Sequence, residues 1–255
     1  KNYLSPLQFF SLLYKASRSY RSIQKVKDRV LQKYDLPFLR KFDTAISYGL
    51  NNPSDAFCIE INKECTNYIM NICDNVIDIQ SKLYGLFNVY NSMAAATCCY
   101  FLGVNENIIK KGLEQTDKVD GRFNVIEFDE KKVVVDFAHT PDGLENVLKA
   151  ARQITYGKLF CLFGCGGNRD KSKRKVMGAI SERYADFCYI TSDNPRYEVP
   201  LEIINDIITG FNSKRYYAIE DRKMAISVAI NSLNKGDTLL VCGKGCEDYI
   251  DIKGQ

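Results

Sequence analysis

Residues 132–164 read KVVVDFAHTPDGLENVLKAARQITYGKLFCLFG, two apolar runs separated by an amphipathic segment. The runs at 132–137 and 158–164 are rich in β-branched and aromatic residues, which predicts buried strands. The segment 141–153 opens with proline, a residue favoured at the first helical position, and is predicted to be a helix. A strand, a helix and a second strand in this order predict a parallel pair joined by a crossover.

The same alternation continues to the end of the chain. Further strands are predicted at 186–191, 216–219 and 237–243, and further helices at 172–184, 200–211 and 221–234. We therefore expect an α/β fold with a mostly parallel sheet and helices on both faces.

The first 117 residues have a less regular pattern. Short strands are predicted within 42–50 and 56–61. Small and apolar residues over 88–102 predict a buried helix that stops at Gly103, because glycine commonly ends helices. A second, more polar helix is expected at about 105–114.

The composition is that of a globular protein. The 255 residues are 45% hydrophobic and 26% charged, and no apolar run approaches the roughly 18 residues that a membrane helix needs. The start KNYLSPLQFF has no signal-peptide pattern. We expect a cytoplasmic chain with no membrane partner, and Lys1 as its first residue indicates a fragment or a processed product.

The counts of histidine and cysteine restrict the chemistry. His139 is the only histidine, which argues against a His-rich metal site and a Ser-His-Asp triad, so metal ligands stay unassigned. Ten cysteines are scattered without a C-x-x-C pair. They predict reduced thiols rather than a disulfide framework.

Positive charge is concentrated in the first 41 residues. This segment holds ten Lys or Arg and two Asp, so its balance is +8 within a chain of net charge +4. The basic residues are spread at roughly helical intervals, with apolar Ile23, Val26, Val30 and Leu31 between them. A solvated helical face is therefore favoured over a nucleic-acid-binding arm, and no nucleic-acid partner is expected.

Four loops follow predicted strands and should lie at one edge of the sheet, where ligands of such sheets bind. They are residues 136–141, 164–171, 192–198 and 243–247. The first carries Asp136 and His139. Asp136 or Thr140 could cap the following helix, or Asp136 and His139 could contact a nucleotide, and both interpretations stay open.

The second loop reads GCGGNRDK at 164–171. Its glycines would let backbone N–H groups approach an anion at a helix N-terminus. Its spacing fits neither G-x-G-x-x-G nor G-x-x-x-x-G-K-[ST]. Arg169, followed by Lys171, Lys173 and Arg174, suits a carboxylate or a phosphate.

The third and fourth loops combine acids with an arginine. Asp193, Asn194 and Arg196 flank a proline, an arrangement that makes either a capped turn or a fork that holds a carboxylate beside an ammonium. The fourth loop reads GKGCED at 243–248. Two arginines and two or three acids at one edge indicate a zwitterionic ligand such as an amino acid.

Seven segments of the chain carry a family resemblance. They read GLFNVYNSMAAA (85–96), GRFNVIEF (121–128), VVVDFAHTPDGLENVL (133–148), FGCGGNRDKSKRKVMGAI (163–180), TSDNPRYEVPLEIINDI (191–207), IEDRKMAI (219–226) and GKGCEDY (243–249). In this order and spacing they resemble the ATP-dependent Mur ligases, most closely the diaminopimelate-adding members. The resemblance runs from about residue 42 to the end, and residues 1–33 match nothing in it.

The resemblance implies a domain organisation and a set of ligands. Residues 1–117 would be part of a central α/β ATPase domain, with about the first 40 residues unplaced, and residues 118–255 the C-terminal, Rossmann-like domain. ATP and Mg²⁺ would be cofactors, with most Mg²⁺ ligands in the missing part of the central domain. UDP-N-acetylmuramoyl-L-Ala-D-Glu and meso-diaminopimelate would be substrates, and a missing N-terminal half would be a further partner.

The resemblance also implies nucleotide-binding residues. Asn88 and Asn91 would contact the adenine of ATP. Arg122, Asp136 and His139 would contact its ribose and phosphates.

The remaining implied site residues would bind diaminopimelate. Its free carboxylate end would be held by Arg169, Asp193, Asn194 and Arg196, and its distal ammonium by Gly243 and Glu247. The Asp-Asn-Pro-Arg tetrad marks diaminopimelate over lysine, because its arginine answers a carboxylate that lysine lacks.

In the family's reaction, ATP phosphorylates the D-glutamate side carboxylate, and the incoming amine attacks the acyl phosphate. The chain departs from the family twice, since it contains neither the G-T-x-G-K-T loop nor the modified-lysine segment, and Cys246 stands where the family usually has histidine. We expect the C-terminal half of a peptidoglycan-precursor ligase, inactive by itself. The alternatives are a non-catalytic amino-acid-binding remnant and a related lysine- or glutamate-adding ligase.

Overall fold

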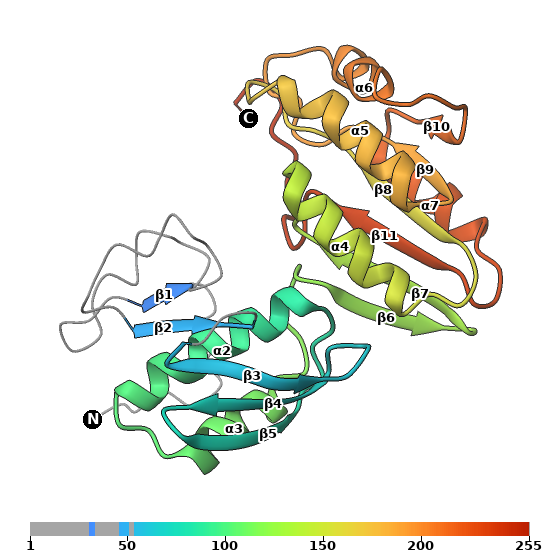
Figure 1. Ribbon diagram of the computed structural model, residues 1–255. Helices are drawn as coiled ribbons and strands as arrows, with labels where there is room; N and C mark the ends of the chain where they lie inside the picture. Colours follow the sequence, from blue (N-terminus) through green and yellow to red (C-terminus); the bar gives the residue numbers. More distant parts are fainter. Residues whose placement is uncertain (1–30, 34–45, 51–53, 255) are drawn as a thin grey trace. The chain divides into compact units, whose positions relative to one another are not determined.

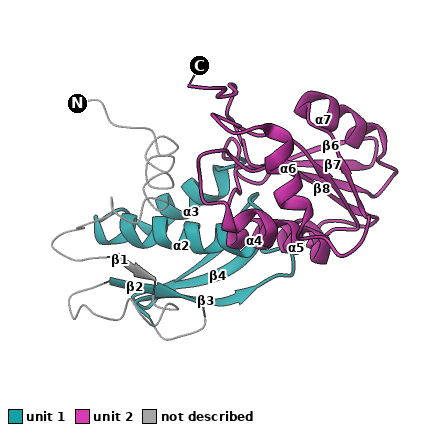
Figure 2. Cartoon of the chain, turned by 90° about the horizontal axis from the view of Figure 1, so that it is seen from above, with its two compact units in different colours: residues 1–118 teal, residues 119–255 magenta. Residues whose placement is uncertain are grey.

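The computed structural model describes residues 31–33, 46–50 and 54–254, and the chain divides into two compact units. Unit 1 spans Lys1–Lys118 and unit 2 spans Val119–Gln255 (Figure 2). Each unit has its own sheet and its own hydrophobic core.

The sheet of unit 2 has six strands in the order β10-β9-β8-β11-β7-β6 (Figure 1). Their bounds are β6 Asn124–Phe128, β7 Lys131–Asp136, β8 Leu159–Phe163, β9 Phe187–Ile190, β10 Tyr216–Ala218 and β11 Thr238–Cys242. All neighbouring pairs are parallel except β6 with β7. The prediction of a mostly parallel sheet is confirmed, and every residue of β8 and β11 is buried, as strands covered on both faces require.

Helices connect the strands of unit 2 and cover both faces of its sheet. They are α4 Pro141–Gln153, α5 Ser172–Tyr184, α6 Pro200–Ile208 and α7 Arg222–Asn231. In Figure 2, α4 and α5 lie on one side of the strands and α7 on the other. The side chains of Thr140 and Asp221 cap α4 and α7, accepting hydrogen bonds from the N–H groups of Gly143 and Met224.

The core under α7 is built from small helical residues and large strand residues. Ala225 and Ala229 pack against Phe160, Leu162 and Leu239. The small alanine side chains let α7 pack closely on the sheet. This close packing fixes the strands that lead into the loops.

Unit 1 has a five-stranded sheet in the order β1-β2-β3-β4-β5, followed by two helices (Figure 1). The elements are β1 Leu31–Lys33, β2 Ile46–Gly49, β3 Ala56–Ile61, β4 Asn67–Ile72, β5 Asn75–Gln80, α2 Leu86–Phe101 and α3 Glu106–Gln115. β1, β2 and β3 pair in parallel, whereas β4 and β5 are antiparallel to their neighbours. The helices predicted over 88–102 and 105–114 are confirmed within two residues.

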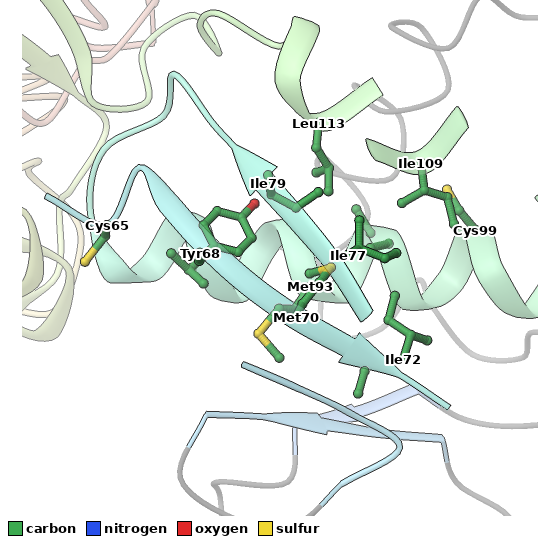
Figure 3. Close-up of a cluster of buried hydrophobic side chains, with 14 residues drawn as sticks. Cys65, Tyr68, Met70, Ile72, Ile77, Ile79, Met93, Cys99, Ile109 and Leu113 are labelled. Carbon is green, nitrogen blue, oxygen red and sulfur yellow. The ribbon is translucent and has the colours of Figure 1, made fainter. Parts of the chain in front are cut away.

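The core of unit 1 lies between the β4–β5 hairpin and its helices (Figure 3). Met70 and Ile79 on the strands, Met93 on α2 and Leu113 on α3 are all buried there. The helix α2 ends where glycine allows it, because Gly103 has φ +84° and donates its N–H to the carbonyl of Tyr100 at 2.9 Å.

Four strands were not predicted, and two tight hairpins explain three of them, β4, β5 and β6. β4 and β5 are joined by the two-residue turn Cys73–Asp74, and β6 and β7 by Asp129–Glu130. All four turn residues have positive φ, as hairpin turns of this length require. Neither turn contains the Asn-Gly or Asp-Gly pair that identifies such hairpins in a sequence.

The basic N-terminal segment was expected to present a solvated helical face. Residues 1–30 and 34–41 lie outside the described residues, and the described piece, Leu31–Lys33, is a strand. Within the described part of the chain, no helix has both the length and the apolar character needed to cross a membrane.

Candidate functional site

The four predicted loops follow β7, β8, β9 and β11, which are parallel in the sheet. Parallel strands end at the same edge, so the loops emerge together at the carboxyl edge of unit 2. The predicted grouping of these loops is confirmed.

Asp136 ends β7 and turns its carboxylate inward, with 3% of the residue exposed. Its Oδ2 accepts a hydrogen bond from the N–H of Phe123 at 2.8 Å, and its Oδ1 one from the N–H of Ala138 at 2.6 Å. Its backbone carbonyl accepts the N–H of Gly243 at 3.2 Å. Asp136 therefore joins three segments at this edge, and the cap of α4 is Thr140.

Arg122, Phe137 and His139 form a cluster beside Asp136. The Arg122 guanidinium lies 4.5 Å from the centre of the Phe137 ring, and the rings of Phe137 and His139 meet edge to face at 5.0 Å. The imidazole Nδ1 lies 2.9 Å from the carbonyl oxygen of Phe137, and His139 is exposed. An exposed imidazole, an aromatic ring and a cation suit the ring and phosphate groups of a nucleotide. Sequence reasoning missed Phe137, although an aromatic residue directly after a strand could have indicated it.

The loops after β8 and β9 are held together by backbone hydrogen bonds. Gly167 donates its N–H to the carbonyl of Asn194 at 2.9 Å, and Arg196 donates from Nη1 to the carbonyl of Gly167 at 3.0 Å. The N–H of Asn168 donates to the Glu198 carboxylate at 2.6 Å. The loops after β8 and β9 are therefore fixed relative to each other.

A buried ion-pair cluster supports these two loops. Arg174, whose side chain is 1% exposed, donates to both carboxylate oxygens of Glu198 at 2.9 and 3.0 Å and to Asp206 at 2.9 Å. Hydrogen bonds from Arg174, Asn168 and Lys171 lower the pKa of Glu198 to about 2. Sequence reasoning missed Glu198 and Asp206, because the partner of a buried arginine cannot be read from spacing.

Three of the four basic residues at 169–174 bind partners within the chain. Arg174 is committed to the internal ion pairs, Lys171 pairs with Glu198 at 3.1 Å, and Lys173 donates to a backbone carbonyl in the loop before α4. Arg169 is exposed and forms no ion pair with the described residues. It is therefore the basic side chain of this group that is available to an external anion.

Asn194 and Glu247 face each other across the β9 and β11 loops. Asn194 is 4% exposed and donates from Nδ2 to Glu247 Oε2 at 3.0 Å. Its Oδ1 accepts a hydrogen bond from Lys244 Nζ at 2.9 Å. Buried Asp193 fixes the backbone at this residue by accepting the backbone N–H of Asn194 at 2.7 Å.

Arg196 lies at the same place with a strained backbone, since its φ is +52°. Its Nη1 donates to the backbone carbonyls of Gly167 and Asn194, and its Nε lies 3.2 Å from Asp251 Oδ2. Carbonyl contacts fix the plane of the guanidinium, which is suited to a planar carboxylate.

A cavity of about 430 Å³ is lined by residues of β7, β11 and α7, by Lys244 and Gly245, and by residues 247–250. Arg222, 9% exposed, lies in its wall and donates to the carbonyls of Cys242 at 2.7 Å and Ser192 at 3.4 Å. Burial lowers the pKa of Arg222. This arginine ties the ends of β9 and β11 together, and no sequence signal marked it.

The predicted site residues fall into three groups. The first group lies at the carboxyl edge of unit 2 and comprises Asp193, Asn194, Arg196, Gly243 and Glu247, with Arg169 in an adjoining loop. The second group lies beside the first and comprises Arg122, Asp136 and His139. The third group, Asn88 and Asn91, lies on α2 of unit 1. In unit 1, Asn88 Nδ2 donates to the carbonyl of Tyr84 at 2.9 Å, and Asn91 Nδ2 lies 3.5 Å from Asn88 Oδ1.

The cysteines of the described chain form no disulfide with one another, as expected for reduced thiols. Burial raises the pKa of most of them, for example that of Cys165 to about 12, so these thiols are protonated at neutral pH. Cys246 is exposed at the carboxyl edge.

Comparison with known proteins identifies relatives of the chain. Residues 121–245 match the family described as Mur ligase, glutamate ligase domain. The UDP-N-acetylmuramoyl-L-alanyl-D-glutamate–2,6-diaminopimelate ligase of Syntrophomonas wolfei is 42% identical over 215 residues, which cover 82% of this chain and 44% of that protein. Clostridium acetobutylicum has a protein with the same name followed by the number 1. It is 37% identical over 246 residues, which cover 93% of this chain and 49% of that protein.

A solved structure shares the fold. The MurF ligase from Thermotoga maritima, in complex with ADP, aligns with a TM-score of 0.66 at 20% identity, over 84% of this chain and 49% of that one. The chain thus spans about half the length of the relatives it matches.

Proposed function

The chain belongs to the Mur ligase family, and from that premise we propose that it is part of an ATP-dependent ligase that adds meso-diaminopimelate to UDP-N-acetylmuramoyl-L-alanyl-D-glutamate. The observation that carries this proposal is that Asn194 contacts both Arg196 and Glu247 at one edge of the sheet. The Arg196 guanidinium donates to the backbone carbonyl of Asn194, and the Asn194 side chain donates to the Glu247 carboxylate. A cation and an acid that contact the same asparagine suit the zwitterionic end of an amino acid.

We assign the distal carboxylate of diaminopimelate to Arg196, with Arg169 as a second, exposed cation. The distal ammonium is assigned to Asn194 Oδ1 and the Glu247 carboxylate, with the Gly243 backbone beside them. Asp193 positions the backbone of Asn194, because its carboxylate accepts the backbone N–H of that residue. Lysine carries the ammonium but lacks the carboxylate, so it would leave Arg196 without its partner.

For ATP we propose the residues that the family resemblance indicates. Asn88 and Asn91 are assigned to the adenine, and Arg122 and His139 to the ribose and phosphates. Asp136 supports Arg122 and His139, because its carboxylate fixes the backbone at the neighbouring residues Phe123 and Ala138. The division of unit 1 as the end of the ATPase domain and unit 2 as the C-terminal domain belongs to the same proposal.

In the ligase reaction this chain would bind and orient the amino acid, whose amine attacks an acyl phosphate on the D-glutamate side chain. No side chain at the carboxyl edge is required as a nucleophile, because positioning supplies much of the acceleration in such reactions. Mg²⁺ would neutralise charge on the transferred phosphoryl group. The described residues contain no cluster of metal-ligating side chains, so we assign it no ligand and no step.

Titration calorimetry with diaminopimelate and lysine tests the proposal. Wild-type protein should bind diaminopimelate more tightly than lysine. Arg196→Ala should reduce the difference between the two affinities, because the loss of a charge-assisted bidentate contact to diaminopimelate costs about 2–3 kcal/mol. Arg183→Ala, which removes an exposed arginine from α5, should leave both affinities unchanged. Equal affinity for the two amino acids in the wild type would refute the assignment.

A further inference from the structure

Lys244 places its ammonium at the position assigned to the ligand's ammonium. Its Nζ donates to Asn194 Oδ1 at 2.9 Å and lies 3.4 Å from Glu247 Oε2. A third hydrogen bond, 2.6 Å to the carbonyl of Tyr249, anchors it, and its side chain is 11% exposed.

Asp251 places its carboxylate at the position assigned to the ligand's distal carboxylate. Its Oδ2 lies 3.2 Å from Nε of Arg196. The backbone around it runs alongside Arg196, since Arg196 donates its N–H to the carbonyl of Asp251 at 3.0 Å and Lys253 donates its N–H to the carbonyl of Arg196 at 2.9 Å. The carboxylate is therefore held against the guanidinium by a short parallel bridge.

Lys244 and Asp251 also share a hydrogen-bond acceptor. Asn194 Oδ1, which accepts from Lys244 Nζ, accepts from the N–H of Asp251 at 3.0 Å as well. An α-amino acid end carries its ammonium and carboxylate on one carbon, so its two sites must adjoin each other, and here Arg196 and Lys244 both contact Asn194. The chain thus fills both sites with its own side chains.

We propose that Lys244 and Asp251 are internal substitutes for the zwitterionic end of the amino acid, and that the ligand binds by displacing them. This inference rests on the proposed function, because it takes Arg196, Asn194 and Glu247 as the ligand's partners. Each substitute satisfies a charged group of the site when no ligand is bound, and each lowers the ligand's affinity by competing with it.

Asp251→Asn tests the carboxylate half. Asparagine keeps the shape and can still accept a hydrogen bond, but it removes the charge that competes for Arg196. Calorimetric affinity for diaminopimelate should rise about fivefold, as expected for a partly exposed ion pair. Affinity for lysine, which has no distal carboxylate, should stay within twofold.

Lys244→Met tests the ammonium half and has a different signature. Both diaminopimelate and lysine carry the ammonium, so both should bind more tightly. Asp248→Asn is the matched control, because it removes an exposed carboxylate from the same segment, and it should change neither affinity.

The outcomes separate this inference from the proposed function. If wild-type protein prefers diaminopimelate and Asp251→Asn binds it equally well or more weakly, the displacement is wrong and the assignment of the site stands. An increase in affinity for diaminopimelate that Asp251→Asn and Asp248→Asn share also overturns the displacement, since the change in net charge would then be the cause. If neither the wild type nor any variant binds diaminopimelate, both proposals are refuted.

Discussion

Glu198 joins the loops after β8 and β9 through the Arg174 guanidinium and the N–H of Asn168. Glu198→Gln removes the charge that Arg174, almost wholly buried, depends on. We expect the free energy of unfolding at pH 7 to fall by about 2 kcal/mol, because a buried guanidinium loses one of two carboxylate partners. Urea denaturation measures this, and Glu202→Gln, an exposed carboxylate on α6, is the control.

The same residue predicts a pH dependence. The pKa of Glu198 is about 2, below its ordinary value of 4.5, so its contribution to stability is complete above pH 4.5. That contribution should disappear as the pH falls from 4.5 towards 2, where the carboxylate becomes protonated in both states. Wild type and Glu198→Gln should therefore converge in stability over this range, and a constant difference down to pH 2 would contradict the assignment.

At the scale of elements, α5 and α6 approach closely at a glycine. A Cβ on Gly178 would meet the backbone carbonyl of Ile207, which cannot move without shifting α6. Gly178→Ala should therefore destabilise unit 2 by about 1–3 kcal/mol, despite alanine's higher helix propensity. Val176→Ala, at an exposed position on α5, should change stability by less than about 0.5 kcal/mol, and a stabilising effect of Gly178→Ala would refute the close packing.

The elements that the sequence predicted are those with long, regular patterns. The helix at 141–153 has the predicted bounds because Pro141 and the cap at Thr140 mark its start. β6 was not predicted because it is an edge strand whose Ile126 and Phe128 stay partly exposed, so burial imposes only a weak pattern on it. Its turn, Asp129–Glu130, adopts positive φ without glycine, and no local signal reveals that.

At the scale of the whole molecule, loop positions were predictable and side-chain partners were not. Parallel strands bring their carboxyl ends together whatever the loops contain, so the grouping of Asn194, Arg196 and Glu247 followed from topology. The pairings of Arg174 with Glu198, of Arg196 with Asp251 and of Lys244 with Asn194 depend on how the loops pack, which residue spacing does not specify.

The central claim is that the carboxyl edge of unit 2 holds the zwitterionic end of diaminopimelate. A crystal structure of the protein with meso-diaminopimelate bound tests it most directly. The account predicts one ligand carboxylate on the Arg196 guanidinium and the adjacent ammonium within hydrogen-bond distance of Asn194 Oδ1 and the Glu247 carboxylate. A ligand that lies elsewhere, with Arg196 and Glu247 both out of contact with it, would contradict the account.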